Sequence, residues 1–213
     1  MKRKTVPQGA FPLDTLVSFV IWAALAVTSV TVEREFRQVA LWTTLLVLSL
    51  IYSSSLRPAP KTILPALGRG IAVGLVLSLP VLFLFQPLLT NVSSRLWPAL
   101  SGAALFQSIV LVAPFVEEVF FRGLVQRQHG LPISAVSYGA FVILFFLPTL
   151  LDSAVIGLII ALIGVILGFI YGYVAERYGL PASVGCHLTV NTFLLFLPLL
   201  FEKLARWLPL SYR

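Results

Sequence analysis

The chain has 213 residues, of which 59% are hydrophobic and only 11% are charged, and its formal net charge is +7. Soluble domains carry about 25% charged residues, so this composition excludes an ordinary soluble domain. We interpret the basic excess as the positive charge that flanks membrane helices on the cytoplasmic side, and we expect no nucleic acid as a partner.

Charged residues are separated by long uncharged stretches, and these stretches define the predicted elements. Seven stretches of 18 to 25 residues contain no Asp, Glu, Lys or Arg. A helix needs about 20 predominantly apolar residues to cross the hydrocarbon core of a bilayer. The sequence therefore predicts an all-α, polytopic transmembrane helix bundle of about seven spans, built as a single membrane domain over residues 1–213.

The N-terminal half contains three of the predicted spans. The first two cover roughly 12–31 and 38–55, and the first is interpreted as a retained helix because no small-residue cleavage site precedes it. The segment "SSSLRPAPK" at 53–61 is predicted to be a connection, since its prolines prevent a helix from continuing. The third span covers about 66–88, and Pro80 predicts a kink within it. A loop is expected at 89–98.

The C-terminal half contains the other four predicted spans, at about 98–126, 132–150, 154–175 and 181–201. The third of these carries glycines spaced by four residues, which let helices approach closely in lipid. We therefore expect this helix to pack tightly inside the bundle. The glycines at this spacing are Gly164, Gly168 and Gly172.

The distribution of basic residues predicts the orientation of the chain. If the N-terminus lies in the cytoplasm, eight basic residues fall on the inner side and six on the outer side. Positive charge accumulates in cytoplasmic loops. The sequence thus predicts a multi-pass integral protein of the plasma membrane or another inner membrane, with a cytoplasmic N-terminus and membrane lipids as its surroundings.

Ionisable and polar side chains interrupt two of the predicted spans. Glu117 and Glu118 lie in the fourth span, and Arg122 follows four residues after Glu118, so these two share a helix face. His187 and Asn191, in the seventh span, are also four residues apart. Ionisable groups inside a membrane are costly and usually face a bundle interior or an aqueous cavity, so they predict a functional site.

Both polar groups are predicted to lie on the same side of the membrane. The glutamates are near the end of the fourth span, His187 is near the start of the seventh, and two crossings separate them. Either group alone would also suit a packing contact between helices. Their matched depth favours a common site.

The segment "EEVFFR" at 117–122 resembles the EExxxR motif of the CAAX-prenyl-protease and bacteriocin-processing (CPBP, Abi) family of intramembrane proteases. His187 and Asn191 fit the later HxxxN motif of that family, and the resemblance covers roughly 98–195. It implies an intramembrane endopeptidase that cleaves a peptide or membrane-protein segment, such as a prenylated chain or a leader peptide.

The resemblance also implies a role for each matching residue. Glu117 is expected to act as general base, with Glu118 and Arg122 positioning it. His187 and Asn191 are expected to polarise the substrate carbonyl and to stabilise the oxyanion.

The middle motif of the family, FxxxH, is incomplete in this chain. Phe141 fits its first position, but Phe145 stands where the family has histidine. The other histidine, His129, lies about 16 Å beyond the glutamates along a continuous helix, so only a sharp chain reversal would bring it to the site. A divalent metal such as zinc, held by Glu117 and His187, is compatible with the family but would lack the usual third protein ligand.

Two other functions stay open at the level of sequence. The missing middle histidine suggests a catalytically inactive pseudoprotease that acts as a scaffold, an assembly factor or a subunit of a membrane complex. The buried glutamates are also compatible with the proton or cation site of a small transporter or channel, although no inverted repeat supports that function.

Overall fold

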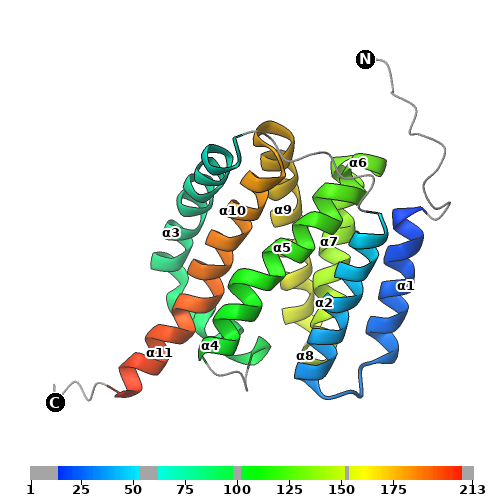
Figure 1. The fold of residues 1–213 in the computed structure, drawn as a ribbon. Helices are drawn as coiled ribbons and strands as arrows, with labels where there is room; N and C mark the ends of the chain where they lie inside the picture. Colours follow the sequence, from blue (N-terminus) through cyan, green and yellow to red (C-terminus); the bar gives the residue numbers. More distant parts are fainter. Residues whose placement is uncertain (1–13, 53–61, 98–101, 152–153, 208–213) are drawn as a thin grey trace, which may run out of the picture.

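The computed structural model describes residues 14–52, 62–97, 102–151 and 154–207, and the predicted connection at 53–61 lies outside them. Within this part of the chain every regular element is a helix, which confirms the all-α prediction (Figure 1). The N-terminal half contributes α1 (Thr15–Thr28), α2 (Arg34–Ile51) and α3 (Ile63–Leu96).

The C-terminal half contains composite helices in which α-helical and π-helical turns alternate. The first is built from α4 (Gly102–Leu105), η2 (Phe106–Val112), α5 (Ala113–Phe120), η3 (Phe121–Val125) and α6 (Gln126–His129). Next come α7 (Leu131–Phe145), α8 (Leu147–Leu150) and α9 (Ala154–Tyr178). The last is built from α10 (Leu180–Asn191), η4 (Thr192–Phe196) and α11 (Leu197–Trp207). Gly130 and Gly179, with φ of 88° and 94°, make the turns into α7 and α10, where a side chain would strain the backbone.

Several of these helices have the length and composition of membrane spans. Among the described residues, four helical segments are long and apolar enough to cross a bilayer: Ile63–Leu96, Ala103–His129, Gly157–Tyr178 and Leu180–Leu204. Two shorter apolar helices, Thr15–Thr28 and Leu131–Phe145, accompany them. These segments fit a helical membrane bundle, and the count of seven crossings stays a prediction.

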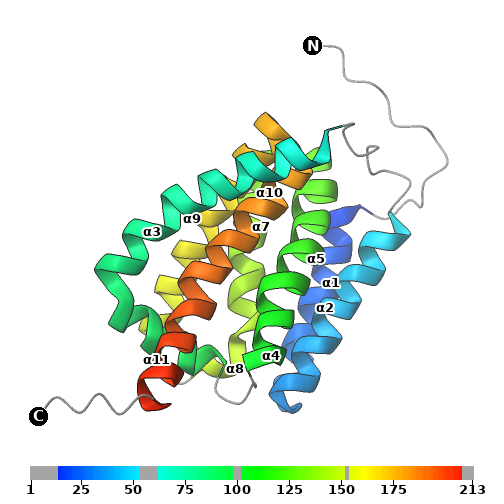
Figure 2. The ribbon, with the colours of Figure 1, turned by 60° about the vertical axis from the view of Figure 1, so that its left-hand side comes forward.

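The third helix departs from the sequence prediction in two ways. The backbone leaves helical geometry at Phe85 (φ −125°, ψ 21°), two residues before Pro87, and not at Pro80. A proline removes a backbone donor and crowds the preceding turn. Here the backbone is distorted in the turn that precedes Pro87. The chain then continues as helix to Leu96, so the loop expected at 89–98 is wrong up to that residue. The bend in α3 is visible in Figure 2.

The helix that carries the first polar motif lies in the middle of the bundle. In both ribbon views α5 lies between α10 and α2 (Figure 1, Figure 2), and it contacts both of them. On one side α10 packs against α3 and α9, and on the other side α1 packs against α2 and α7. The glutamates of α5 are thereby placed where α2, α7 and α10 can reach them.

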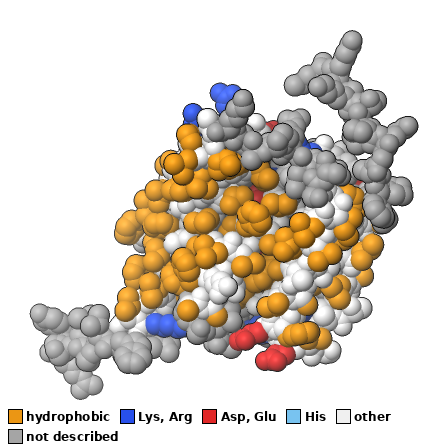
Figure 3. All heavy atoms as spheres, viewed as in Figure 1, with side chains coloured by type: hydrophobic (Ala, Val, Ile, Leu, Met, Phe, Trp, Pro, Cys, Tyr) orange, Lys and Arg blue, Asp and Glu red, His pale blue; other side chains and the backbone are white. Residues whose placement is uncertain are grey.

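The face of α9 that carries the glycines packs closely against its neighbour, as predicted, but the other side of the helix is exposed and is not inside the bundle. A Cβ atom added at Gly168 would lie 2.8 Å from the backbone oxygen of Ala135 in α7, so only glycine allows this close contact. On the other side of α9, Leu158 and Tyr173 are 73% and 60% exposed. Hydrophobic side chains also cover most of the face seen in Figure 3, with most charged side chains near its upper and lower ends. Such a surface suits contact with lipid tails.

Candidate functional site

Widened helical turns flank the segment that carries the two glutamates. Glu117 and Glu118 lie in α5, with the π-helical turns of η2 before them and η3 after them. Pro114, at the start of α5, has no backbone N–H, which removes one donor where η2 passes into α5. Arg122 lies in η3. Single π-helical turns inside α-helices are frequent at functional sites.

Glu118 is fully buried and is held by three side chains. Its Oε1 lies 3.2 Å from Nη1 of Arg122 and 2.9 Å from Nδ1 of His187. Its Oε2 accepts a hydrogen bond from the hydroxyl of Ser183. Because so many donors occupy this carboxylate, Glu118 is suited to orienting its neighbours rather than to binding a further ligand.

His187 has its two ring nitrogens in different surroundings. A carboxylate only accepts hydrogen bonds, so the contact with Glu118 assigns a proton to Nδ1 of His187. Its Nε2 lies 3.3 Å from the hydroxyl of Tyr138 and 3.8 Å from Oε2 of Glu117. The ring is stacked on Tyr171, with centroids 4.5 Å apart, and only 2% of the residue is exposed. This packing fixes the direction in which Nε2 points.

Glu117 points to a different set of partners. The indole Nε1 of Trp42, in α2, donates to Oε1 at 3.1 Å, and the hydroxyl of Tyr138, in α7, donates to Oε2 at 3.0 Å. Glu117 is only 5% exposed. Each carboxylate oxygen therefore has one neutral donor, and Oε2 also faces His187.

Arg122 joins the site to α9. Its Nη2 donates to the backbone carbonyl of Gly168 at 3.1 Å, and its guanidinium lies 4.4 Å from the ring centroid of Tyr138 and 5.4 Å from that of Tyr171. A guanidinium over aromatic faces is attracted by the ring electrons. These contacts hold both the cation and the two phenol rings in place.

The amide of Asn191 is hydrogen-bonded within the fold. Its side-chain Nδ2 donates to the backbone carbonyl of Ile109, in η2, at 2.9 Å. This bond supplies a donor to a carbonyl in a widened turn. In the described structure four of the predicted site residues come together around Tyr138: Glu117, Glu118, Arg122 and His187. The amide of Asn191 instead connects the end of α10 to η2.

The phenylalanine at the middle-motif position is part of an aromatic wall. Phe145 is 2% exposed, and its ring centroid lies 4.8 Å from that of Trp42 and 5.5 Å from that of Phe141. His129 does not replace the missing imidazole, since its Nε2 contacts Oδ1 of Asp14 at 2.5 Å, at the start of α1. The chain reverses at Gly130, but His129 stays at the end of α6, beside Asp14, and the reversal does not bring it to the glutamates.

Three site residues have no counterpart in the sequence prediction: Trp42, Tyr138 and Ser183. Trp42 is 75 positions from Glu117, so no local pattern connects them. Ser183 lies four residues before His187, and that spacing was a usable signal for a shared helix face. Tyr138 was recognisable only as a hydroxyl within an apolar helix.

The residues present do not fit a zinc ion. Two atoms face one another in a way that would let both bind a metal ion: Oε2 of Glu117 and Nε2 of His187. The carboxylate of Glu118 is already occupied by Arg122, His187 and Ser183. In the part of the chain that the structure describes, no group of three His, Cys, Asp or Glu side chains is arranged to hold a metal. A catalytic zinc site usually has three protein ligands and a water.

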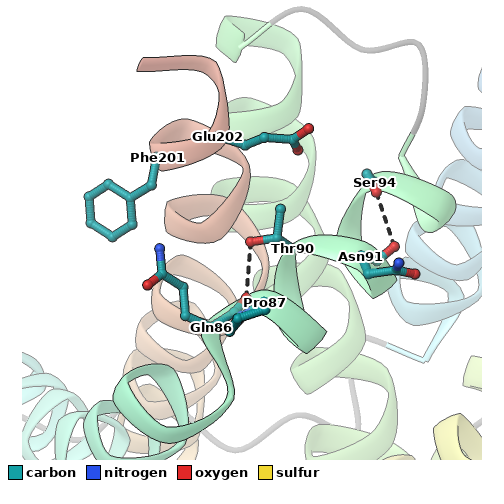
Figure 4. A pocket seen from close by; sticks show the side chains of 7 residues that line it. All are labelled: Gln86, Pro87, Thr90, Asn91, Ser94, Phe201 and Glu202. Atoms are coloured by element: carbon teal, nitrogen blue, oxygen red, sulfur yellow. Dashed lines mark hydrogen bonds between the residues drawn. The ribbon is translucent and has the colours of Figure 1, made fainter. Parts of the chain in front are cut away.

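A pocket of about 530 Å³ lies elsewhere in the molecule, between the part of α3 beyond its break and α11 (Figure 4). It is lined by Gln86, Pro87, Thr90, Asn91, Ser94, Phe201 and Glu202. None of these residues contributes to the cluster around Glu117. The pocket and the candidate site are therefore separate features.

Comparison with known proteins gives one match. The family model described as type II CAAX prenyl endopeptidase Rce1-like matches residues 74–193. No curated protein and no solved structure matches the chain. The matched segment includes α5, α7 and α10, with both polar motifs and Tyr138, whereas Trp42 lies outside it.

Proposed function

The chain belongs to the Rce1-like family of type II CAAX prenyl endopeptidases, and on that basis we propose that it is an intramembrane endopeptidase whose general base is Glu117. With its four long apolar helical segments, the chain is an integral membrane protein. The observation that carries the proposal is the pair formed by Oε2 of Glu117 and Nε2 of His187, 3.8 Å apart, with Glu118 behind the imidazole.

The charges of the cluster balance in a way that suits this chemistry. Two carboxylates, Glu117 and Glu118, face two groups that can carry positive charge, Arg122 and His187. With Nδ1 bonded to Glu118, a protonated His187 presents its second N–H toward Glu117 and toward any group bound beside it. That N–H is the donor that we assign to the carbonyl oxygen of a substrate.

Hydrolysis then follows from the positions of these two residues. A water molecule within hydrogen-bond distance of both Glu117 and His187 would lose a proton to the carboxylate as its oxygen attacks the peptide carbon. The N–H of His187 would stabilise the oxyanion. When the C–N bond breaks, the protonated Glu117 would return the proton to the leaving amine. Stabilisation of the oxyanion by Asn191 stays a prediction, because it requires the amide to leave the carbonyl of Ile109.

The proposal is tested by cleavage assays on the purified protein in lipid nanodiscs. The substrates are internally quenched peptides that end in a prenylated Cys followed by two aliphatic residues and a variable residue, together with unprenylated copies. Glu117→Gln is expected to lower kcat by about 100- to 10,000-fold, the range for loss of a general base. Glu35→Gln, which changes an exposed carboxylate on α2, is the matched control and should keep the wild-type rate. Wild-type cleavage by Glu117→Gln would refute the assigned mechanism.

A second function is favoured by one specific observation, the aromatic wall at Phe145. Since this ring stands at the middle-motif position and packs on Trp42, the same fold would also suit a pseudoprotease that binds a membrane segment without cutting it. That function predicts no product from any peptide of the panel. It also predicts that a membrane partner co-purifies equally with the wild type and with Glu117→Gln. A specific product that depends on Glu117 would exclude it.

A further inference from the structure

We propose that Tyr138 is a positioning residue of this site, and that its hydroxyl couples the carboxylate of Glu117 to the imidazole of His187. The inference deepens the proposed function and rests on it for its catalytic consequence. Its structural basis is that one hydroxyl lies 3.0 Å from Oε2 of Glu117 and 3.3 Å from Nε2 of His187. Tyr138 belongs to neither of the polar motifs.

The ring of Tyr138 is buried and packed on several sides. The residue is 4% exposed, and the guanidinium of Arg122 lies 4.4 Å from its ring centroid. Phe121 meets the ring edge-on at 5.3 Å, and Phe141 stacks on it at 5.9 Å. These contacts restrict the ring on several sides, so the hydroxyl is held in place before a substrate binds.

The number of protons available determines how the hydroxyl of Tyr138 can bond to its two neighbours. A phenol has one proton to donate, and its oxygen can accept another hydrogen bond. If Tyr138 donates to Glu117, its oxygen can accept the Nε2 proton of a protonated His187 until a substrate carbonyl takes over that N–H. The result is a continuous chain from Glu118 through His187 and Tyr138 to Glu117. If His187 loses its Nε2 proton, that nitrogen becomes an acceptor and competes with Glu117 for the proton of Tyr138.

Trp42 provides the second half of this arrangement, on the other oxygen of Glu117. Its indole N–H donates to Oε1, and Phe145 supports the indole ring with centroids 4.8 Å apart. Tyr138 and Phe145 are seven residues apart on α7, two helical turns, so they lie on the same face. One face of α7 therefore both holds Glu117 directly and braces the tryptophan that holds it. The two donors fix the carboxylate without a second imidazole.

The inference is tested through the ring-nitrogen NMR resonances of His187 in isotope-labelled protein. The chain has only two histidines, so His129→Gln, introduced in every sample, leaves His187 as the single signal source. Tyr138→Phe removes the hydroxyl and keeps the ring. It is expected to shift the Nε2 resonance while Nδ1, bonded to Glu118, stays in place. Tyr173→Phe, which changes a 60% exposed tyrosine on α9, should leave both resonances unchanged.

Trp42→Phe distinguishes the two halves of the arrangement. It removes the donor to Oε1 of Glu117 and does not touch His187, so the Nε2 resonance should keep its wild-type position. In the peptide cleavage assay, Tyr138→Phe and Trp42→Phe are each expected to lower kcat about 10- to 100-fold, the effect of one hydrogen bond to a charged group, with KM nearly unchanged. The pH profile of kcat should change in Tyr138→Phe only.

The NMR and kinetic measurements can fail separately. If Nε2 of His187 does not respond to Tyr138→Phe, the coupling is refuted, whatever the activity. If Nε2 responds but no peptide is cleaved by the wild type, the coupling stands as a structural feature and the proposed endopeptidase function fails. If the wild type cleaves and Tyr138→Phe cleaves with the same kcat and pH profile, Tyr138 has no positioning role in the reaction.

Discussion

Replacing Gly70 by alanine is expected to force α10 away from α3 and to weaken the whole bundle. Gly70 is buried where α3 crosses α10, and a Cβ atom added there would lie 1.9 Å from the backbone oxygen of Ala182. An ordinary contact of a Cβ atom is 3.4–4 Å, so the helices would have to separate by about 1.5 Å. The obstructing atom belongs to the backbone of α10, and no change of rotamer removes it.

The size of the effect follows from two opposed terms. Alanine is favoured over glycine inside a helix by about 1 kcal/mol. Overpacking a well-filled contact costs roughly 1–3 kcal/mol and occasionally more. A separation of this size corresponds to an overpacking cost at or beyond the upper end of that range. After the gain in helix propensity is subtracted, we expect the free energy of unfolding to fall by about 2 kcal/mol. For a chain of this length that corresponds to a melting temperature lower by roughly 4–8 °C.

The same displacement is expected to reach the site. Ser183 follows Ala182 directly and donates to Glu118, and His187 lies one turn further along α10. Moving this part of α10 would loosen both contacts. Gly70→Ala should therefore also lower the cleavage rate, because the imidazole would no longer be held in line with Glu117.

Gly68 supplies the matched control. It lies two residues earlier on α3, and nothing is found within 4 Å of a Cβ atom added there. Gly68→Ala gains the same helix propensity without a clash, so its melting temperature should equal or exceed that of the wild type. Thermal unfolding of both variants in nanodiscs is the assay. Equal melting temperatures for Gly68→Ala and Gly70→Ala would refute the packing argument.

Two other substitutions test buried charge. Arg37→Met should lower the melting temperature more than Arg34→Met. The guanidinium of Arg37 is buried and donates to backbone carbonyls at helix ends, among them that of Phe145 at 2.5 Å, whereas Arg34 is half-buried. Similar losses in the two variants would contradict this expectation. Arg122→Met should destabilise by about 3–5 kcal/mol, since it leaves the buried Glu118 without its guanidinium. Adding Glu118→Gln should recover part of that loss in a double-mutant cycle, and an additive cycle would count against the ion pair.

The features that the sequence predicted best depend on local pattern. Apolar stretches of about 20 residues have the length of a helix that crosses a bilayer and satisfies its own backbone groups, so composition and charge spacing alone predict the all-α membrane bundle. The four-residue spacing between Glu118 and Arg122 places them on one helix face whatever the rest of the fold does. The resemblance to an intramembrane protease family also depends on short motifs, and the family match confirms it.

A prediction based on a single residue was changed in the fold. Pro80 lies within continuous helix, while the backbone leaves helical geometry at Phe85, two residues before Pro87. Both prolines carry the same local signal, so the sequence does not say which of them disturbs the helix. The oxyanion role expected for Asn191 stays a prediction. In the fold its amide donates to the carbonyl of Ile109, a contact that the spacing from His187 does not predict.

The composition of the site around Glu117 was decided by the tertiary structure. Trp42 and Tyr138 come from other helices, 75 and 21 residues away from Glu117, and each reaches the carboxylate only because its helix packs beside that carboxylate. The sequence pattern does not predict such a contact, because a donor side chain in an apolar helix is surrounded by the same kinds of residues whether it faces lipid or a carboxylate. The sequence by itself therefore determined that charges lie inside a membrane bundle. The packing of the helices determined which neutral donors hold those charges, because a buried carboxylate is stable only where the fold brings donors to it.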